Sequence, residues 1–460
     1  MRRTCTIRLV PDEKTEKILF EIGDICAKAW NELNYMRRRQ FFNKQGVDFK
    51  KTYELIYERY KKEVGTVTIQ QLINKNTEAW KSFFSLLELK KEGKLPSYIK
   101  PRPPGYWKDY ERGKRTPIIV LRKDQYRFEN GKVIISMLGK YGRLEIPYKG
   151  RLHLIGEKGR AEIIYDWCLK RWYMHISFDV KKKYVRDELI DIPKKPLGNL
   201  KAGIDLGINN LFAVYVSSGV SFLVNGRPLK AEAYYWRKRI AEYQSMLNKY
   251  GLKTSRRLRR MWKKLMKRIE HYVRTWIRRV VEILWELGVD YIFIGYPKDI
   301  ARNRPENWND YVARVNFLVV NIWGYRKIIR WFTDVAEEYG IKVKPIEEDY
   351  TSITCPLCGQ VHYNGRITRG LFKCPVYNKV MNADIVGAYN ILIRGLQELI
   401  TPSGGKKPRR GNGPKTRPRA EPKRGCSPNL PALATPRTLA LKGGEKVSVA
   451  RSRYIMEINL

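Results

Sequence analysis

Residues 200–224 read LKAGIDLGINNLFAVYVSSGVSFLV, and this stretch decides the fold of the second half of the chain. Three apolar segments are separated by turn-forming residues at Gly207–Asn210 and Ser217–Gly219. The pattern predicts three short antiparallel strands joined by tight turns. Asp205 closes the first of these strands, directly before the first turn.

The pattern after these strands alternates between helices and strands. Helices are expected at about 229–250, 253–287, 309–339 and 384–399, and strands at 289–297 and 341–348. Antiparallel hairpin strands followed by alternating helices and strands are typical of an RNase H-like fold.

The first half of the chain predicts a different architecture. A first strand, TCTIRLV at 4–10, precedes residues 11–90, whose apolar positions recur at helical spacing. Residues 117–181 are rich in strand patterns, with a tight hairpin turn at Glu129–Lys132. The Pro-rich stretch at 94–107 is expected to be an ordered or semi-rigid linker. We therefore predict a small β-barrel interrupted by a helical insertion.

Charge and composition bound the function. The 460 residues hold 91 Lys+Arg and 46 Asp+Glu, for a formal net charge of +45. An excess of this size predicts a polyanionic partner, and nucleic acid fits best. No apolar run of about 18 residues could span a membrane, and the N-terminus lacks the apolar stretch of a signal peptide. We expect a cytoplasmic protein with nucleic acid as its partner, and the abundant Lys, Arg and Glu suggest a thermophilic source.

Residues 401–460 differ in kind from the rest. They hold 14 Lys/Arg, three acids and eight Pro, with little hydrophobic periodicity before the final residues. This composition predicts a disordered basic tail.

The predicted helix after Lys253 is strongly cationic. Between Lys253 and Arg279 it carries twelve Lys/Arg and one acid, Glu270, together with an apolar stripe at helical spacing. So many like charges repel one another without a partner, which favours contact with a nucleic-acid backbone over a merely solvated surface. The predicted nucleic-acid-binding residues are Arg256, Arg257, Arg259, Arg260, Lys263, Lys264, Lys267 and Arg268.

Two aspartates are candidates for phosphodiester chemistry. Asp205 ends a strand, and Asp384 lies in the first turn of the last predicted helix. Phosphodiester hydrolysis uses converging carboxylates that hold two divalent metals. Each residue also has a simple structural explanation, because aspartate often caps turns and helix N-termini. Spacing in the sequence does not show whether the two face each other.

Three segments, in this order, resemble the TnpB (OrfB) family of insertion-sequence proteins: GIDLGINNLFAVYV, TSITCPLCG and NADIVGAYNIL. That family is related to the type V CRISPR effectors, and its members are RNA-guided DNA endonucleases with a RuvC-like nuclease. The resemblance extends from the first strand to about residue 400. It implies that Asp205 is the first catalytic carboxylate and Asp384 the last, and that the site holds two Mg²⁺ ions. It also implies guide RNA and target double-stranded DNA as partners, with no small-molecule substrate and no membrane. The protein is then expected to be prokaryotic and nucleoid-associated, with a thermophilic archaeon as one source.

The middle carboxylate departs from the family pattern. Relatives commonly carry glutamate at the end of the central strand, where this chain has Gly295, Tyr296 and Pro297. Some relatives carry it on the strand before the TS-x-x-C motif, and Glu348 fits that arrangement. Because side chains alternate along a strand, Glu347 and Glu348 point to opposite faces, and only one can face the cleft. We favour Glu348 as the third metal ligand, with Glu347 as the alternative. A third possibility is a site without its middle carboxylate.

A cysteine cluster predicts a zinc ribbon with one member missing. Cys355 and Cys358 form one C-x₂-C pair, and Cys374 follows after fifteen residues. Two complete pairs at this spacing would be a strong zinc-ribbon signal. Tyr377 stands where the family pattern expects the fourth cysteine. Either His362 completes a Cys₃His site, or the ribbon has lost its metal and keeps its fold by packing.

We therefore predict an α+β multidomain protein that acts as a metal-dependent, RNA-guided DNA endonuclease of a transposable element. One alternative is a nuclease-inactive RNA-guided or plain DNA-binding relative, and another is a strand-transferring transposase that acts without RNA. The predicted parts are a β-barrel at 1–10 and 107–198, a helical insertion at 11–106, a RuvC-like domain at 199–350 and 380–400, a zinc-ribbon-like insertion at 351–379 and the tail at 401–460.

Overall fold

The computed structural model of the chain describes most of residues 1–400 and two short strands beyond them. The described ranges are 1–95, 99–109, 113–185, 188–296, 324–348, 351–368, 370–400, 438–441 and 455–458. They divide into two compact units, Met1–Ile192 and Pro193–Leu460. Across these ranges, every helix is too short or too polar to cross a lipid bilayer.

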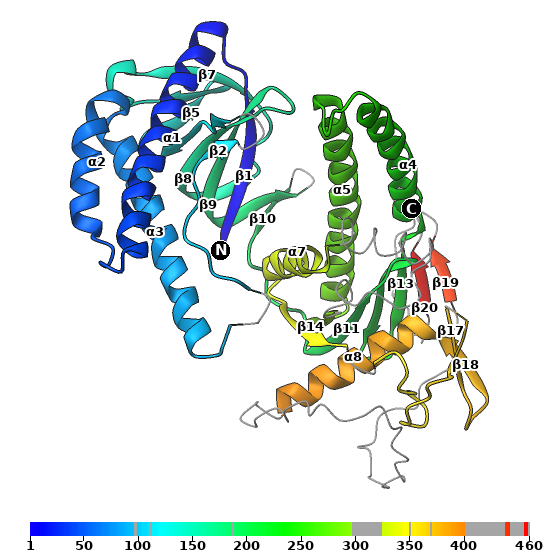
Figure 1. The fold of residues 1–460 in the computed structure, drawn as a ribbon. Helices are drawn as coiled ribbons and strands as arrows, with labels where there is room; N and C mark the ends of the chain where they lie inside the picture. Colours follow the sequence, from blue (N-terminus) through cyan, green and yellow to red (C-terminus); the bar gives the residue numbers. More distant parts are fainter. Residues whose placement is uncertain are drawn as a thin grey trace. The chain divides into compact units, whose positions relative to one another are not determined.

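The first unit is built on an eight-stranded antiparallel sheet (Figure 1). Its order is β4-β8-β9-β1-β7-β6-β5, and β10 pairs with β9. Within the described residues no pairing joins the end strands β4 and β5, so the predicted barrel is a nearly closed sheet. The strands are β1 (Arg2–Leu9), β4 (Ile118–Leu121), β5 (Tyr126–Glu129), β6 (Lys132–Ile135), β7 (Leu144–Lys149), β8 (Leu154–Asp166), β9 (Arg171–Val185) and β10 (Glu188–Asp191), with a separate pair β2 (Lys108–Asp109) and β3 (Lys114–Arg115).

The hairpin turn predicted at Glu129–Lys132 is confirmed. Strands β5 and β6 pair up to Glu129 and Lys132, which leaves a two-residue loop. Asn130 and Gly131 both have positive φ, of 45° and 72°. This is the backbone of the turn type whose twist matches that of the two strands, and it explains why Asn-Gly stands here.

Three helices pack on this sheet and share its core: α1 (Glu13–Phe42), α2 (Phe49–Val64) and α3 (Thr66–Lys91). Asp12 and Asp48 cap the first two by accepting hydrogen bonds from backbone N–H groups in the first turn. Leu19 and Ile22 of α1 belong to one buried cluster with the sheet residues Ile119 and Met174. The helical insertion and the barrel, predicted as separate parts, are therefore a single unit.

The Pro-rich linker is ordered over its described part and lies against α1. We call residues 103–107 the strap. Trp107 stacks on Trp30 of α1, with ring centroids 4.3 Å apart and an interplanar angle of 8°. Trp30 Nε1 donates to the Gly105 carbonyl at 3.0 Å, and Asn34 Nδ2 donates to the Pro104 carbonyl at 2.8 Å. These contacts fix the backbone of a segment that has no regular secondary structure.

The second unit has a mixed sheet in the order β15-β14-β11-β12-β13-β20-β19. Strands β11, β12 and β13 are antiparallel neighbours, as the opening sequence predicted, whereas β14 and β15 run parallel to β11 and to each other. The bounds are β11 (Leu200–Leu206), β12 (Asn210–Val216), β13 (Ser221–Asn225), β14 (Val289–Tyr296), β15 (Lys342–Glu347), β19 (Thr438–Leu441) and β20 (Ile455–Ile458).

The prediction of a wholly disordered tail is wrong for two short segments. β20 pairs in parallel with the edge strand β13, and β19 pairs with β20. Both segments are mainly apolar, unlike the basic, Pro-rich sequence before them. An edge strand offers unpaired N–H and C=O groups, so apolar segments of the same chain can extend the sheet.

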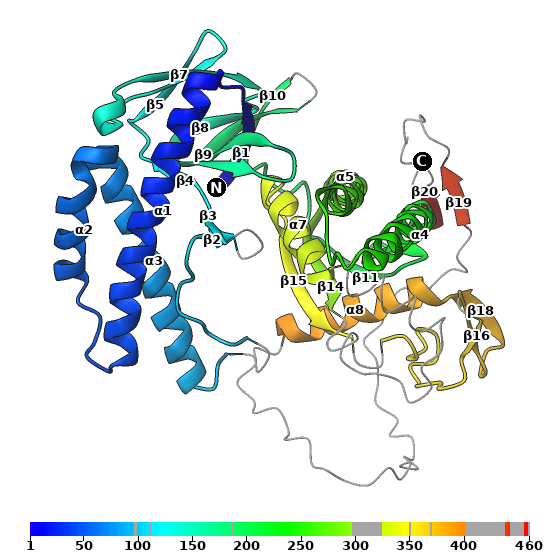
Figure 2. The ribbon, with the colours of Figure 1, turned by 45° about the horizontal axis from the view of Figure 1, so that its top comes forward.

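Helices cover both faces of this sheet (Figure 2). The helices α4 (Arg227–Lys249), α5 (Arg256–Glu286) and α7 (Tyr325–Glu338) pack on one face, in the cluster that includes Ile204 and Ile294. α8 (Ala383–Ile400) packs on the other face, against Ala213 and Phe293. Of the helix expected at 309–339, only the part after 323 falls within the described residues, and there it is confirmed as α7.

A small antiparallel sheet precedes α8. It consists of β16 (Arg366–Thr368), β17 (Leu371–Cys374) and β18 (Lys379–Asn382) in that spatial order. Its inner face buries Phe372, Cys374 and Met381 together with Val386 of α8. We call residues 351–382, apart from the undescribed Arg369, the ribbon.

Candidate active site and metal centre

Asp205 lies near the end of β11 and faces α8. Along this strand Ala202 and Ile204 pack toward α4 and α5, so the alternate residues Gly203 and Asp205 face the opposite helix. A Cβ added at Gly387 of α8 would lie 2.9 Å from Asp205 Oδ2, which shows how closely the helix approaches the carboxyl group. Asp205 pairs with Ala213 inside the sheet, so it is a strand residue and not a turn cap.

Glu348 faces α8, and Glu347 lies on the opposite side of the strand. On β15, Lys344 Nζ pairs with Glu398 of α8 at 2.9 Å, and Ile346 is buried with the α8 side chains. Glu348 continues this alternation directly after the strand ends. Its carboxyl oxygen Oε1 is buried and has no hydrogen-bond partner.

Asp384 enters the same face of the sheet from the start of α8. Asn382 Oδ1 accepts the Asp384 backbone N–H at 3.0 Å and so caps the helix. The Asp384 carboxylate is therefore not needed as the cap. Instead its Oδ2 accepts a hydrogen bond of 2.7 Å from Asn210 Nδ2, at the end of the turn that follows Asp205.

The carboxyl groups of Asp205 and Glu348 act electrostatically on each other. Burial, and then the negative charge of Asp384, raises the pKa of Asp205, and the Arg366 charge opposes this shift only in part. Burial, and then the charge of Asp205, raises the pKa of Glu348. Both groups thus sit where two negative charges are unfavourable unless a cation joins them.

The residues present fit a divalent cation. Carboxylate oxygens are the ligands that Mg²⁺ prefers, and an unpartnered, buried carboxyl oxygen such as Glu348 Oε1 is a group that a cation would satisfy. Among the described residues, the groups of three or more His, Cys, Asp or Glu that are placed to hold a metal ion do not include these three carboxylates.

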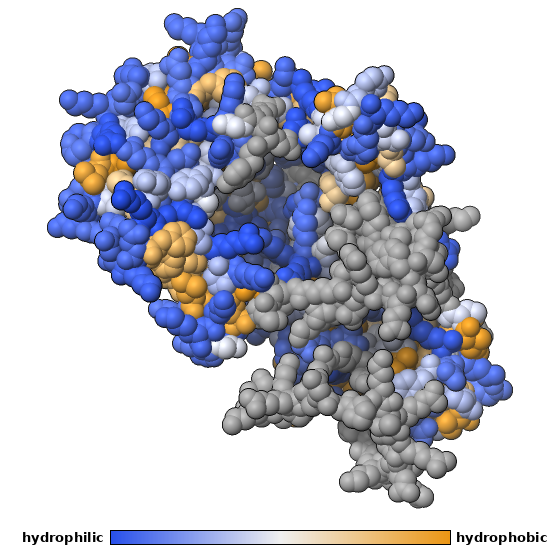
Figure 3. Space-filling model, in the orientation of Figure 1, coloured by the Kyte–Doolittle hydropathy of each residue, from blue (hydrophilic) through white to orange (hydrophobic). Residues whose placement is uncertain are grey.

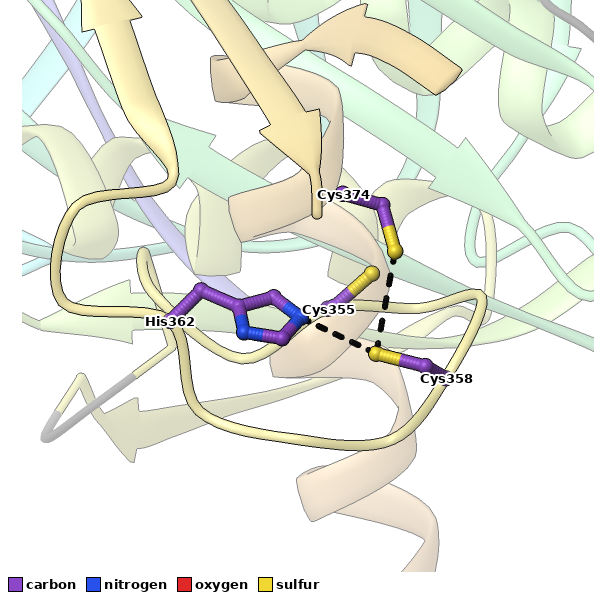
Figure 4. A group of neighbouring side chains, drawn as sticks. All are labelled: Cys355, Cys358, His362 and Cys374. Carbon is purple, nitrogen blue, oxygen red and sulfur yellow. Dashed lines mark hydrogen bonds between the residues drawn. The ribbon is translucent and has the colours of Figure 1, made fainter. Parts of the chain in front are cut away.

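A second donor set is placed to hold a metal ion. One ligand atom from each of Cys355, Cys358, His362 and Cys374 lies within 4.8 Å of the others (Figure 4). His362 Nε2 is 3.0 Å from Cys358 Sγ, which in turn is 3.8 Å from Cys374 Sγ. Three thiols and an imidazole are a standard donor set for tetrahedral zinc. The structure therefore brings His362 together with the three cysteines, as the Cys₃His interpretation predicted.

Tyr377 does not take the place of a fourth ligand. Its side chain is 56% exposed. Burial alone would raise the pKa of Cys374, but the backbone N–H groups of Tyr377 and Val376, with the neighbouring thiols, lower it overall. The turn at Tyr377 therefore still donates backbone hydrogen bonds to Cys374. The fourth side chain of the cluster comes from His362.

Comparison with known proteins matches this architecture to one family. A family model described as OrfB_IS605, probable transposase, matches residues 175–301, and a Cas12f1-like TNB domain model matches residues 325–391. The TnpB-like protein ORF457 of Acidianus two-tailed virus is 38% identical over 422 residues, which is 87% of this chain and 88% of that protein. The chain belongs to the TnpB-like family.

Other relatives of this TnpB-like protein are more distant. The CRISPR-associated endodeoxyribonuclease Cas12f1 of Sulfoacidibacillus thermotolerans is 27% identical over 262 residues, 53% of this chain and 55% of that protein. Among solved structures, a Cas12f1–sgRNA–target DNA complex covers 83% of each chain, with a TM-score of 0.51 and 14% identity. This structural likeness shows a shared fold.

The basic residues predicted to bind nucleic acid all lie on α5 of the TnpB-like chain, and they differ in how far they are exposed. Arg257, Arg260, Lys264, Lys267 and Arg268 are exposed, whereas Arg256, Arg259 and Lys263 are partly buried. Burial, and then the nearby charge of Lys267, lowers the pKa of Lys263. Hydrophilic residues also predominate on the face of the molecule drawn in Figure 3.

Some exposed cations of α5 are held by α4. The Arg257 guanidinium lies 5.0 Å from the Tyr243 ring centroid, and Lys264 Nζ lies 5.3 Å from the ring of Trp236. Arg268 contacts the Trp236 ring and the Glu232 carboxylate. Part of the cationic face is therefore pre-positioned on an aromatic surface.

Three residues near the site were missed by sequence reasoning. Asn210 was assigned only to a turn, although a turn directly after a candidate carboxylate is a place to look for its partners. Arg366 was not considered, because only the folded ribbon brings its charge near Asp205. Asn390 Nδ2 donates to the carbonyls of Thr351 and Thr354, at 2.7 and 2.8 Å, and ties α8 to the ribbon.

Proposed function

We propose that this TnpB-like protein is an RNA-guided DNA endonuclease of a transposable element, with a RuvC-like site formed by Asp205, Glu348 and Asp384. The observation that carries the proposal is the pair Asp205 and Glu348: two buried, mutually repelling carboxyl groups on the α8 face, one with an orphaned oxygen. Such an arrangement destabilises the folded protein unless it binds a cation, so it has a functional explanation and lacks a structural one.

The fold and the relatives support the same proposal. The strand order, with three antiparallel strands followed by two parallel ones, suits an RNase H-like nuclease core. One relative is named an endodeoxyribonuclease, and a solved relative is a complex with sgRNA and target DNA. Guide RNA and double-stranded DNA are accordingly the partners that we assign to this chain, and guide–target pairing would supply the sequence specificity.

The chemistry follows from what the carboxylates would hold. Two Mg²⁺ ions held by these carboxylates would supply an activated nucleophile and would stabilise the charge that develops on the scissile phosphate. A bound cation would favour the ionised forms of Asp205 and Glu348, against the burial and the neighbouring negative charge that raise the pKa of each. Asn210 holds one oxygen of Asp384 through its hydrogen bond and leaves the other free to coordinate.

Nucleic-acid contacts fall to α5 in this proposal. Lys264 and Lys267 are exposed side chains on the same helix as the partly buried Lys263, and backbone phosphates would relieve their mutual repulsion. The ribbon has a structural task. Zinc held by Cys355, Cys358, His362 and Cys374 would fix the ribbon against the start of α8, where Asp384 lies.

The test is cleavage of plasmid DNA, in Mg²⁺, by the full chain purified with RNA transcribed from its own locus. Wild type is expected to cut, and Asp205→Ala and Glu348→Gln are expected to lose on the order of 10³-fold in rate, since each removes a metal ligand worth several kcal/mol. Glu347→Gln is the matched control on the other face of β15 and should cut as wild type.

Three results would contradict parts of this proposal. Binding of a matched target without any cleavage by wild type would establish the nuclease-inactive alternative. Cleavage by Glu348→Gln but not by Asp205→Ala would remove Glu348 from the site. End-specific joining of DNA by protein freed of RNA would point instead to a strand-transferring transposase.

A further inference from the structure

Gly295 lies near the end of β14, beside the carboxyl group of Glu348. A Cβ added at this glycine would lie 2.2 Å from Glu348 Oε1 and 3.0 Å from its Cδ. Real Cβ atoms do not approach other heavy atoms so closely. Any side chain at position 295 would therefore displace the Glu348 carboxyl group from the place it occupies.

Backbone conformation does not explain this glycine. Gly295 is not among the residues with positive φ, and it pairs with Ile346 inside a parallel ladder. Glycine in the interior of a strand weakens it, because it packs no side chain and loses more entropy on folding. The benefit that offsets this cost has to lie in the space that the missing side chain leaves open.

Sheet order gives that space a purpose. β14 lies between β15 and β11, so Glu348 and Asp205 are two strands apart, about 10 Å across the sheet. Ile204 pairs with Ile294, which places Asp205 and Gly295 next to each other at the same level. To approach Asp205 on the α8 face, the Glu348 side chain has to pass over β14 at Gly295. The nearness of the Glu348 carboxyl group to the Cβ position of Gly295 shows that it does so.

We propose that Gly295 is a positioning residue for the third carboxylate. It leaves open the path by which Glu348, from the neighbouring strand, reaches the site. The space above Gly295 thus has room for the Glu348 carboxyl group or for a side chain at position 295, but not for both. This inference rests on the proposed function of Glu348 as a metal ligand, and it adds the residue that makes that ligand possible.

The experiment measures Mn²⁺ binding to the full-length, RNA-free chain by electron paramagnetic resonance, with melting temperatures recorded for every variant. Gly295→Ala should weaken Mn²⁺ affinity by about 10- to 100-fold, the range typical when a residue that orients a metal ligand is changed. Gly105→Ala is the matched control, because a Cβ there meets nothing within 4 Å. It should bind Mn²⁺ as wild type does. Equal affinity in Gly295→Ala and wild type would overturn the inference.

A second comparison distinguishes a clash with Glu348 from a clash with Ile391. The added Cβ would also lie 2.6 Å from Ile391 Cδ1, so Gly295→Ala could disturb packing alone. In a Glu348→Ala background the clash with the carboxyl group is gone. In that background Gly295→Ala should lower the melting temperature by much less than it does in wild type. If the Gly295→Ala single variant fails to fold, the added Glu348→Ala change should restore its folding. An equal loss in both backgrounds would assign the effect to Ile391 and overturn the inference.

Glu348→Gln distinguishes this inference from the proposed function. If Glu348→Gln loses Mn²⁺ affinity while Gly295→Ala keeps it, Glu348 is a ligand but Gly295 does not position it. If Glu348→Gln binds Mn²⁺ as wild type does, Glu348 is not a ligand, and the inference falls with that assignment.

Discussion

The carboxylate site and the ribbon differ in how they replace a missing donor. The ribbon has Tyr377 where the family pattern expects cysteine, and the carboxylate site has Gly295 at the strand end where it expects glutamate. In the ribbon, His362 completes a set whose ligand atoms lie within 4.8 Å of one another. In the proposed carboxylate site, Glu348 would reach in from the next strand, and the three carboxylates are not among the groups already placed to hold a metal ion within the described residues.

The difference follows from charge. Thiols and a neutral imidazole can gather without a metal, because they contact one another through weak hydrogen bonds such as that between Cys358 and His362. Carboxylates repel, so their convergence is limited until a cation arrives. A metal site with neutral donors can therefore be assembled in advance, whereas one with acidic donors has to be completed by its ion.

The largest expected effect is on the ribbon. Wild-type protein should contain about one zinc per chain, and His362→Ala should lose it together with several kcal/mol of stability, since binding of a structural zinc is coupled to folding. Tyr377→Ala should retain the metal, because this side chain points to solvent. Elemental analysis and thermal unfolding measure both quantities. A His362→Ala variant that keeps its zinc and its melting temperature would contradict the Cys₃His assignment.

A smaller effect concerns the pH dependence of the metal-free protein. Asp205 and Glu348 have a raised pKa in the folded state, so between about pH 4 and their folded pKa the native chain holds protons that the unfolded chain has lost. Stability should therefore fall as pH rises through this window, by at most about 1.4 kcal/mol per pH unit for each retained proton.

The measurement is denaturant unfolding between pH 5 and pH 8 in protein dialysed free of Mg²⁺ and Mn²⁺, without a chelator, because chelators that bind Mn²⁺ bind zinc more tightly. The double variant Asp205→Asn/Glu348→Gln cannot ionise at these positions and should show a flatter profile. Identical slopes for wild type and the variant would mean that folding does not raise the pKa of Asp205 or of Glu348.

The smallest effect tests whether the two regions are linked. Asn390→Leu removes the two hydrogen bonds from α8 to the Thr351 and Thr354 carbonyls. The loss should cost about 1–3 kcal/mol of stability, because two partly buried carbonyls lose their partner. Gln397→Leu, a change of the same chemistry at an exposed position of α8, is the control. If hydrogen exchange in the ribbon rises only for Asn390→Leu, α8 and the ribbon are coupled through this residue.

In both regions, sequence reasoning predicted the helices, strands and motifs better than the contacts between them. The period of two along β15 showed that Glu347 and Glu348 oppose each other. Which of them faces α8 depends on where that helix packs, and the Lys344–Glu398 ion pair reveals it. The spacing of the cysteines indicated a ribbon, but the approach of His362 to Cys358 depends on backbone turns that no simple periodicity encodes.

Sequence reasoning predicted less where a feature depends on contacts between residues that are far apart in the sequence. The space beside Gly295 exists because β14 lies between β15 and β11, which is a property of the sheet order. The tail composition predicted disorder, and the apolar pattern of its final residues did not show that two segments add to the sheet edge. The resemblance to the TnpB family is confirmed by the relative from Acidianus two-tailed virus, whereas the roles of individual site residues remain predictions.

The strap has a consequence for anyone who wishes to shorten this protein. The segment that follows α3 is attached to α1 at two points. Trp107, at the end of the strap, stacks on Trp30, and Arg115, further along the chain, forms a bidentate ion pair with Asp24. Cutting out residues 11–106 as a cassette would strip Trp107 of its partner and uncover the sheet residues that α1 buries. A compact derivative should keep α1 with the strap, and any trimming should begin at the far end of the α1–α2 hairpin.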